Sequence, residues 1–462
     1  MEKAPKHPNT KSRNPAQTFL VVNPNAAGID IGDTVHAVAV PPGSCPEDTE
    51  TVRSFGTMTC DLKEIATWLK ECHVDTVAME STGVYWKPLF SLLNREGIAV
   101  CLVNARFAKN VSGRKTDESD AAWIQKLHSC GLLNSSYLPG EEQEVLRTLV
   151  RFRETLVADS SRFVLRMQKA LELMNIKLHT VIRDITGKTG RAIVEAILAG
   201  EREPQNFLPL VHPRIQATKE EILKSLQGTW REEHLFTLRE SYGFYCFFLN
   251  RIQITDVKIE EQLQAFEASQ NDGELSEGSP GKRKPEIPKK KNKNNPKFDV
   301  RKYLHRILGV DAVAIYGMNE LSGLRILAEI GVDMSKWPTE KHFISWLNLC
   351  PNNKISGGKL ISSKVMKKTP SGAAQAFRAA ANGLQRSDHW LGDYFRRMKA
   401  KGGNKYAIIA TASKIATIYY KMVRTQTEFL PQNLEEYRIK NKQQKIRYLE
   451  RKLRELKADE PD

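Results

Sequence analysis

The sequence predicts an α/β domain with a mixed sheet, then long helices, and then a mostly helical C-terminal region. Between residues 27 and 140, three strand patterns precede an alternation of helical and strand patterns, which indicates a sheet of mixed strand direction. From about residue 141 the apolar residues recur at helical spacing instead. Residues 298–430 are rich in small residues and again helical in pattern, so we expect a second globular region there.

The α/β pattern opens with two short strands in AGIDIGDTVHAVAV, and Gly32 and Asp33 lie near the turn between them. A third strand, TVRSFGTMT, precedes the helical pattern LKEIATWLKECH, whose apolar residues share one face. VDTVAME and IAVCLV are typical of buried strands, and the helical pattern YWKPLFSLLNREG separates them. The segment DESDAAWIQKLHSCGLL is then predicted to be a helix.

An apolar stripe predicts a helix over residues 141–175, which would be about 50 Å long at about 1.5 Å per residue. Its coiled-coil-like spacing is set by Leu149, Phe152, Leu156, Phe163, Met167, Leu171 and Met174, and four arginines lie off it: Arg147, Arg151, Arg153 and Arg162. A second helical region is predicted over residues 215–268. A bundle within one protomer would explain both, but we favour contact between chains, because long apolar stripes often mediate assembly.

The whole chain divides into six predicted segments. They are a flexible basic arm (1–26), the α/β domain (27–140), a coiled-coil helical region (141–268), a basic linker (269–297), the second globular region (298–430) and a charged C-terminal helix (431–462). The linker is polar and poor in apolar residues. Its Lys/Arg run at 282–293 is either a solvated tether or a segment that follows nucleic acid, and both interpretations stay open.

Composition narrows the class of protein. The 462 residues hold 70 Lys+Arg and 54 Asp+Glu, a formal charge of +16, which favours nucleic acid as a partner before an anionic membrane surface. No stretch approaches the length of apolar sequence that a membrane span needs, and the N-terminus has no apolar signal region. The seven cysteines form no CxxC pair, which argues against a disulfide scaffold or structural zinc site and favours a reducing cytoplasm.

Four carboxylates carry the strongest chemical signal. Asp30 lies within a strand between two isoleucines, where a charge is costly without a partner, and Glu80 ends the strand VDTVAME. Asp117 and Asp120 are three apart at a helix start and share a face. Hard oxygen ligands of this kind suit Mg²⁺ or Mn²⁺, and two such ions about 4 Å apart can promote in-line attack on phosphate. Helix capping is the structural alternative for Asp117 and Asp120.

Basic residues accompany both candidate centres. Arg114 and Lys115 precede the second pair of acids and are predicted to hold a phosphate backbone, with a solvated turn as the alternative. In the second region Ser356 precedes two glycines, and five lysines surround it: Lys354, Lys359, Lys364, Lys367 and Lys368. A serine that attacks a phosphodiester needs such cations to offset charge. A plain loop is the alternative, and Ser362 and Ser363 are rival nucleophiles without adjacent glycines.

These residues resemble a known family. Asp30, Glu80 and the run KTDESDA (115–121) look like the four acids of a RuvC-like domain with the RNase H fold. In order along the chain, LRTLVRFRETLVADSSR (146–162), TGKTGRAIVEAILAGEREP (186–204), LSGLRILAEIG (321–331) and NKISGGK (353–359) extend the likeness. Together they resemble the insertion-sequence-110 family of bacterial transposases, the bridge-RNA-guided recombinases, over roughly 27–265 and 303–425.

The resemblance implies a DNA transposase with an N-terminal RuvC-like domain, a coiled coil and a C-terminal transposase domain. It implies metal ligation by Asp30, Glu80, Asp117 and Asp120 and a covalent phosphoserine link through Ser356. It further implies an element-encoded guide RNA that pairs with donor and target DNA, and dimers or tetramers in which acids and serine come from different protomers. The arm, linker and C-terminal helix depart from the family pattern. A resolvase-like nuclease, a non-catalytic nucleic-acid-binding protein and, last, an actin-like sugar kinase are the competing interpretations.

Overall fold

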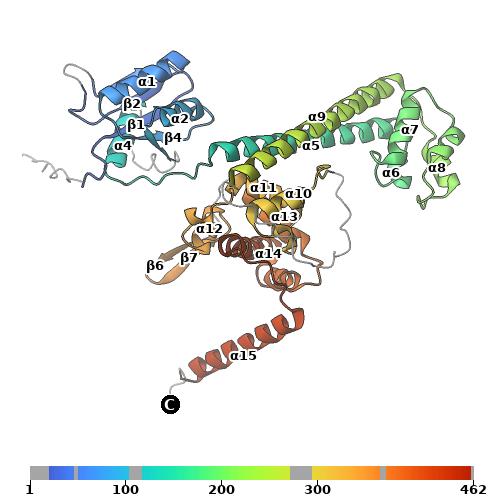
Figure 1. Cartoon of the computed structure of the whole chain (residues 1–462). Coiled ribbons are helices and arrows are strands. Elements are labelled where there is room, and N and C mark those ends of the chain that lie inside the picture. Colours follow the sequence, from blue (N-terminus) through green and yellow to red (C-terminus); the bar gives the residue numbers. More distant parts are fainter. Residues whose placement is uncertain (1–19, 46–49, 104–116, 271–293, 365–370, 459–462) are drawn as a thin grey trace, which may run out of the picture. The chain divides into compact units, whose positions relative to one another are not determined.

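The computed structural model describes residues 20–45, 50–103, 117–270, 294–364 and 371–458. The chain divides into two compact units, Met1–Leu138 and Pro139–Asp462 (Figure 1). Residues 1–19 of the predicted arm and 271–293 of the predicted linker lie outside the described residues. The division into six segments stays a prediction. None of the described helices combines the length and apolar character that crossing a bilayer requires.

The first unit is built on one five-stranded sheet with the strand order β3-β2-β1-β4-β5. Strands β1, β2 and β3 pair antiparallel, whereas β4 and β5 run parallel to β1, so the predicted mixed sheet is confirmed. The elements are β1 Ala26–Ile31, β2 His36–Ala39, β3 Val52–Phe55, α1 Thr59–Glu71, β4 Thr76–Glu80, α2 Trp86–Arg95, β5 Ala99–Val103 and α4 Asp117–Ser129.

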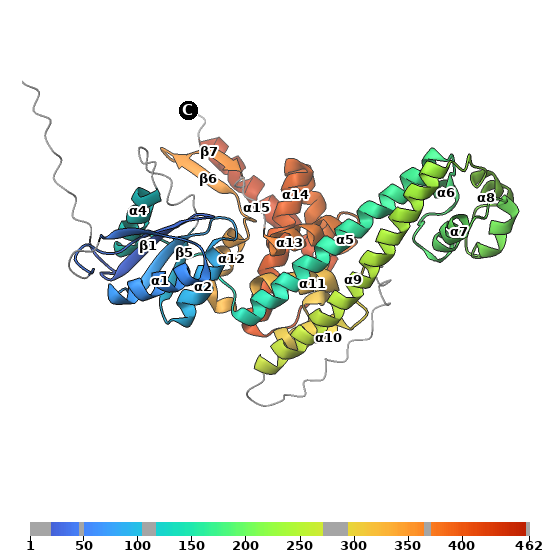
Figure 2. The same ribbon diagram turned by 90° about the horizontal axis from the view of Figure 1, so that it is seen from above.

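The strands of this sheet present different side chains to its two faces. On one face, Ile29 and Ile31 of β1 and Met79 of β4 join the apolar side chains of α1 and α2 in the main core of the unit. On the other face, small residues of β2 pack against Ala121 of α4. Figure 2 shows α4 on one side of the sheet and α1 and α2 on the other. Small side chains on the α4 face allow that helix to approach the strands closely.

The second unit begins with two long helices that pack along each other, α5 and α9 (Figure 1). Shorter helices connect the C-terminal end of α5 to the N-terminal end of α9. The bounds are α5 Glu141–Leu173, α6 Leu178–Val181, α7 Lys188–Leu198, the 3₁₀ turn η1 Pro204–Leu210, α8 Lys219–Ser225 and α9 Glu232–Gln270. The helix predicted over 141–175 is confirmed. The region predicted over 215–268 is helical in two pieces, α8 and α9.

Two predictions about the stripe on α5 need correction. Leu156, Met167 and Leu171 are buried as expected, but Phe152 is 54% exposed and Arg153, predicted to lie off the stripe, is 4% exposed. The reason is that the buried face follows Leu146, Val150 and Arg153, and a buried partner on α9 neutralises the arginine. Since α9 of the same chain covers this face, packing within one protomer explains its burial. Assembly between chains stays a prediction.

The remainder of the second unit is mostly helical, as predicted. Buried aromatic side chains, among them Phe343, Phe377 and Tyr419, form its centre. The helices are α10 Val300–Leu308, α11 Glu320–Ile330, α12 Glu340–Trp346, α13 Gly372–Gly383, α14 Trp390–Thr425 and α15 Leu434–Ala458, with 3₁₀ turns η2 Ala312–Ala314 and η3 Met334–Lys336. Helix α14 is interrupted at Gly403, where φ is +80°.

One element of this region differs from the sequence expectation. The glycines after Ser356 form a turn, but the sequence did not predict the two strands that flank it, β6 Asn352–Ser356 and β7 Lys359–Lys364. Strand patterns are hard to recognise here, because lysine and serine fill positions that apolar residues occupy in buried strands. The hairpin is exposed, so no apolar alternation was required of it.

Candidate active site and nucleic-acid interface

Two of the predicted acids meet at one edge of the sheet. Asp30 is the penultimate residue of β1, and Glu80 is the last residue of β4. These strands are parallel neighbours, and Ile29 pairs with Met79. One step further along the same register places Asp30 alongside Glu80, at a strand separation of about 4.8 Å. Two residues that the sequence separates widely are therefore neighbours at the carboxyl ends of their strands.

Both acids belong to the face of the sheet that α4 covers. Side chains alternate along a strand, so Asp30 shares its face with Gly28 two residues earlier. A Cβ atom at Gly28 would lie 2.2 Å from the backbone nitrogen of Gln125 and 2.5 Å from the carbonyl oxygen of Ala121, both on α4. The helix backbone thus lies directly on β1, and only glycine leaves room for it.

We call the end of the sheet that carries Asp30 and Glu80 the acid edge. The direction of α4 brings its first turn towards this edge. Gln125 Nε2 donates to the carbonyl oxygen of Ala26 at 3.0 Å, so the later part of the helix lies at the start of β1. Ala121 packs instead with Ala37, the cross-strand partner of Asp30. The first turn, which carries Asp117 and Asp120, therefore lies towards the end of β1 that holds Asp30.

A histidine holds α4 to the second acid-bearing strand. His128 Nε2 lies 3.0 Å from the hydroxyl oxygen of Thr76, at the start of β4. Burial lowers the pKa of His128, so the neutral imidazole is favoured. The helix is thus tied to β1 by Gln125 and to β4 by His128. These two contacts position the first turn of α4 relative to the strands that carry Asp30 and Glu80.

Glu80 is the most buried of the three predicted acids whose side chains the structure describes. The residue is 4% exposed, and its carboxylate accepts a hydrogen bond from the Thr82 hydroxyl at 2.8 Å. A buried carboxylate beside a second acid is costly unless protons or cations compensate it. Carboxylate oxygens at strand ends are the ligands that Mg²⁺ and Mn²⁺ prefer, so the donor chemistry fits such ions.

Within the described part of the chain, no group of three or more acids, histidines or cysteines has the arrangement of a metal site. The side chain of Asp117 is outside that part, so the fourth predicted ligand cannot be included. The alternative role of Asp117 and Asp120, stabilisation of the start of a helix, is also compatible with the structure. Asp117, Glu118 and Asp120 lie in the first turn of α4, where negative charge stabilises a helix.

Ser356 lies at the tip of the exposed β6–β7 hairpin. It pairs with Lys359 across a two-residue turn formed by Gly357 (φ +53°) and Gly358 (φ +75°). Two successive residues with positive φ define the turn type that suits hairpins best. The geometry of the turn therefore explains why both positions are glycine. The Ser356 hydroxyl makes no hydrogen bond to any other described residue.

The rival serines occupy different positions. Ser362 pairs with Lys354 and Ser363 pairs with Asn353, so both lie within the β ladder. Ser356 is the last paired residue before the turn, so it lies nearer the tip of the hairpin than either rival. The choice among the three serines stays a prediction.

The predicted phosphate-binding residues divide into two groups. Lys354 and Lys359 are exposed on the hairpin, and Lys364 is the last residue of β7. The other four, Arg114, Lys115, Lys367 and Lys368, lie outside the described residues. Lys359 is directly opposite Ser356 and Lys354 is two residues before it, so at least two cations accompany the serine.

Sequence reasoning missed an arginine–carboxylate network on α5. Arg151 donates through Nε at 2.7 Å and through Nη2 at 2.9 Å to the buried carboxylate of Glu329 on α11. Arg325 lies 3.1 Å from Glu154 in the same region. Arg153 pairs with Asp256 of α9, and its Nη2 donates to the Asn294 carbonyl oxygen at 2.7 Å. These arginines connect helices, so they are structural rather than free to bind phosphate.

Comparison with protein families resolves the class of protein. A family model of the IS110 DEDD type, described as a transposase, matches residues 27–176, which span the acid edge and α5. A second, described as the transposase IS116/IS110/IS902 family, matches residues 313–396, which span the serine hairpin. The chain belongs to the IS110 family of transposases. It is therefore a transposase or recombinase enzyme. No curated protein matches the chain.

For an IS110-family transposase, the two matched segments coincide with the two candidate centres. The first contains all four predicted acids, and the second contains Ser356 with Lys354, Lys359, Lys364, Lys367 and Lys368. A transposase acts on DNA, which accords with the formal charge of +16. Neither match covers α15.

Proposed function

We propose that this transposase recombines donor and target DNA under the guidance of an element-encoded RNA, through a covalent phosphoserine intermediate and a Mg²⁺-dependent acid site. In this proposal the first unit is a RuvC-like domain of the RNase H fold, and Asp30, Glu80, Asp117 and Asp120 hold Mg²⁺ or Mn²⁺. The guide RNA and the phosphoserine step come from the family resemblance.

The observation that supports the proposal most directly is the register of β1 and β4. It brings Asp30 and Glu80 side by side on the face that α4 covers, with Asp120 on the first turn of that helix. Bound Mg²⁺ would neutralise charge on the scissile phosphate and lower the pKa of a coordinated hydroxyl. Asp30 and Glu80 lie on paired strands of one sheet, and rigid support of this kind is what a catalytic site requires.

The proposed serine chemistry comes from the family resemblance, and the exposed hairpin is compatible with it. Ser356 Oγ attacks phosphorus, an Oγ–P bond forms, and the P–O bond to the deoxyribose breaks. The serine proton is lost to a base, and the departing deoxyribose oxygen gains a proton. The exposed ammonium groups of Lys354 and Lys359 offset charge on the phosphate oxygens. Attack by the hydroxyl of the second DNA strand reverses these bonds and restores the serine, so no ATP is consumed.

The exposed position of Ser356 supports assembly of the active centre from more than one chain. No described residue accepts a hydrogen bond from its hydroxyl, so its activation requires another group. The family implies that acids and serine come from different protomers of a dimer or tetramer. We therefore propose an assembly in which the hairpin of one protomer meets the acid edge of its partner. We further propose that it works on DNA in the bacterial cytoplasm.

The test is a search for a covalent adduct. The protein is expressed with the native flanking DNA of its element, purified with its RNA, and mixed with labelled donor and target duplexes in Mg²⁺. We expect an SDS-resistant protein–DNA adduct that Ser356→Ala abolishes and that Ser362→Ala and Ser363→Ala retain. Nuclease treatment of the RNA or removal of Mg²⁺ should also abolish it.

Different failures identify different functions. Cleavage in Mg²⁺ without an adduct would indicate a resolvase-like nuclease and remove the phosphoserine step. Tight DNA binding without cleavage would indicate a non-catalytic protein. An adduct that forms equally well without RNA would leave the serine chemistry intact and contradict RNA guidance.

A further inference from the structure

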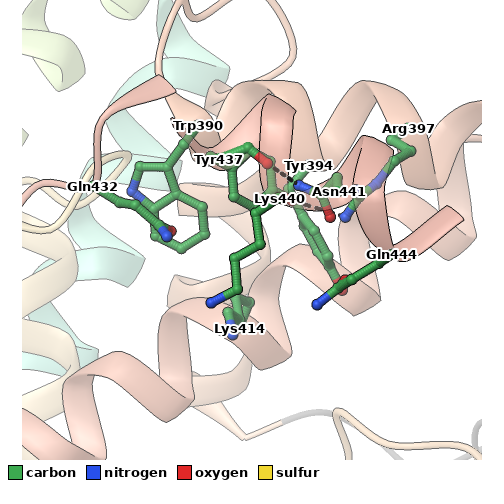
Figure 3. Close-up of a pocket in the computed structure, with 9 residues that line it drawn as sticks. All are labelled: Trp390, Tyr394, Arg397, Lys414, Gln432, Tyr437, Lys440, Asn441 and Gln444. Atoms are coloured by element: carbon green, nitrogen blue, oxygen red, sulfur yellow. Dashed lines mark hydrogen bonds between the residues drawn. The ribbon is translucent and has the colours of Figure 1, made fainter. Parts of the chain in front are cut away.

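A basic and aromatic pocket lies between α14 and α15, remote in sequence from the acids and from Ser356. We call it the α14–α15 pocket, and its volume is about 270 Å³. Trp390, Tyr394, Arg397 and Lys414 line it from α14, and Tyr437 and Lys440 line it from α15. Figure 3 shows these side chains around one opening, together with three amide side chains. The pocket forms where the first turns of α15 meet the first turns of α14, through contacts such as that of Tyr437 with Trp390.

The wall of the pocket is aromatic. The rings of Trp390 and Tyr437 lie 5.4 Å apart at an interplanar angle of 51°, and the two residues are 5% and 8% exposed. The buried indole Nε1 of Trp390 has no hydrogen-bond partner among the described residues. A buried donor without an acceptor is costly, so a ligand whose binding brings an acceptor to this nitrogen would gain a hydrogen bond.

The rim of the pocket is cationic. Lys414 and Lys440 are exposed, and neither has a salt bridge to a described carboxylate. Figure 3 shows their ammonium ends converging at the opening. No aspartate or glutamate lines the pocket in the described part of the chain. An anion would therefore meet three positive charges, with Arg397 as the third.

Arg397 links the rim to the wall. Its Nη2 donates to the Tyr437 hydroxyl at 2.8 Å, and its guanidinium lies 5.6 Å from the ring centre of Tyr394 and 5.4 Å from that of Tyr437. Burial raises the pKa of Tyr394 and of Tyr437, so both phenols stay neutral and do not repel an anion. The arginine is thus held in place while its charge remains available.

We propose that the α14–α15 pocket binds one unpaired nucleotide of a single-stranded nucleic acid, with the base against the aromatic wall and a phosphate between Lys414 and Lys440. Aromatic side chains combined with lysine and arginine are the features that bind single strands without sequence preference. The volume suits a single nucleotide and is below the usual range for larger ligands. Strand exchange by a transposase exposes unpaired strands, so the ligand is available. The inference requires the transposase family and neither the acid site nor Ser356.

The test compares two double variants of the full-length protein. K414A/K440A removes two charges from the pocket, whereas K442A/K445A removes two exposed charges from α15 that do not line it. Binding of fluorescein-labelled 12-nucleotide oligo-dT and oligo-U is measured by anisotropy in EDTA over a range of salt. For K414A/K440A we expect about tenfold weaker binding near 0.15 M salt and a salt slope smaller by about 1.4. The preferred oligonucleotide tells whether the strand is DNA or RNA.

Three controls make the test decisive. A 12-base-pair duplex should lose little affinity in K414A/K440A, because its bases are not free to enter the pocket. Trp390→Phe keeps an aromatic ring but removes the N–H, and should weaken single-strand binding about threefold without changing the salt slope. Melting curves check that each variant is folded. Equal losses for the two double variants, equal losses for duplex and single strand, or no loss at all would each overturn the proposal. The assay contains EDTA, so neither Mg²⁺ bound at the acid site nor Ser356 contributes to the signal. Failure of the recombination mechanism would therefore leave this result unchanged.

Discussion

The acid edge and the serine hairpin support their chemical groups in opposite ways. Asp30 and Glu80 lie on strands whose alternate residues are buried in a core, and a third element, α4, lies directly over them. Ser356 lies at the tip of a two-stranded hairpin whose described residues are mostly exposed. The acids are therefore fixed by tertiary packing, whereas among the described residues the serine is positioned by its own turn and ladder.

The difference indicates a division of tasks. Carboxylates that share a metal must keep their separation within narrow limits, which requires the rigid support of several elements. A nucleophile that bonds to DNA must instead reach a substrate and remain attached while strands exchange. An exposed hairpin is suited to that task. Changes that disturb packing at the acid edge should therefore lower stability and catalysis together, whereas changes at the hairpin should affect catalysis alone.

The largest effect is expected from Asp30→Asn, which removes one charge without changing size. Loss of a metal ligand should lower Mg²⁺-dependent strand cleavage by at least about 10³-fold, or about 4 kcal/mol in the barrier. Stability should change little or increase, because the change relieves repulsion with the neighbouring Glu80. Cleavage of labelled DNA at saturating Mg²⁺ measures the first effect and thermal melting the second.

The matched control for this prediction is Asp33→Asn. Asp33 is exposed in the turn between β1 and β2, three residues from Asp30. Its substitution by asparagine removes the same charge as Asp30→Asn. It should leave cleavage within about twofold of the parent protein, a change of less than 1 kcal/mol. Equal losses in both variants would show that net charge near β1 matters rather than ligation, and would contradict the acid site.

A smaller effect that combines stability with activity is expected from Gly28→Ala. The new Cβ would clash with backbone atoms of α4, which no side-chain rotation relieves. Overpacking of this kind costs about 1–3 kcal/mol. The first unit should melt at lower temperature, and cleavage should fall because α4 and its acids are displaced. Gly43→Ala is the control, because it has a positive φ but open space, so it should cost less.

The fold of the first unit could be predicted from the sequence because its signals are local. Apolar strands such as VDTVAME and the turn at Gly32 predicted the elements, and their order indicated a mixed sheet. Strand register could not be predicted, because pairing of Ile29 with Met79 depends on contacts across the sheet. The acids were therefore proposed as a set, while their adjacency came only with the structure.

Two features escaped prediction for physical reasons. Arg153 follows Leu146 and Val150 at the spacing of a buried face, but a charged residue is assigned to the surface unless its partner is known, and Asp256 lies far along the chain. The α14–α15 pocket likewise requires residues of two helices to meet. The sequence of α14 or of α15 alone does not indicate the contact of Trp390 with Tyr437. Nor does it indicate that the indole N–H lacks a described hydrogen-bond partner.

The smallest change in stability, and the sharpest contrast with Gly28, is expected from Gly357→Ala. At φ +53° an alanine costs about 1–2 kcal/mol, and there is no clash because nothing lies within 4 Å of the new Cβ. The hairpin is exposed and contributes nothing to a core, so the melting temperature should stay unchanged while the rate of adduct formation falls about tenfold. Gly383→Ala is the control, since this glycine is helical and equally open, and it should affect neither the melting temperature nor the rate of adduct formation.

If Gly357→Ala instead lowered the melting temperature as much as Gly28→Ala, the hairpin would be part of the folded core and the contrast between the two regions would fail. If adduct formation were unaffected, the turn would not position Ser356.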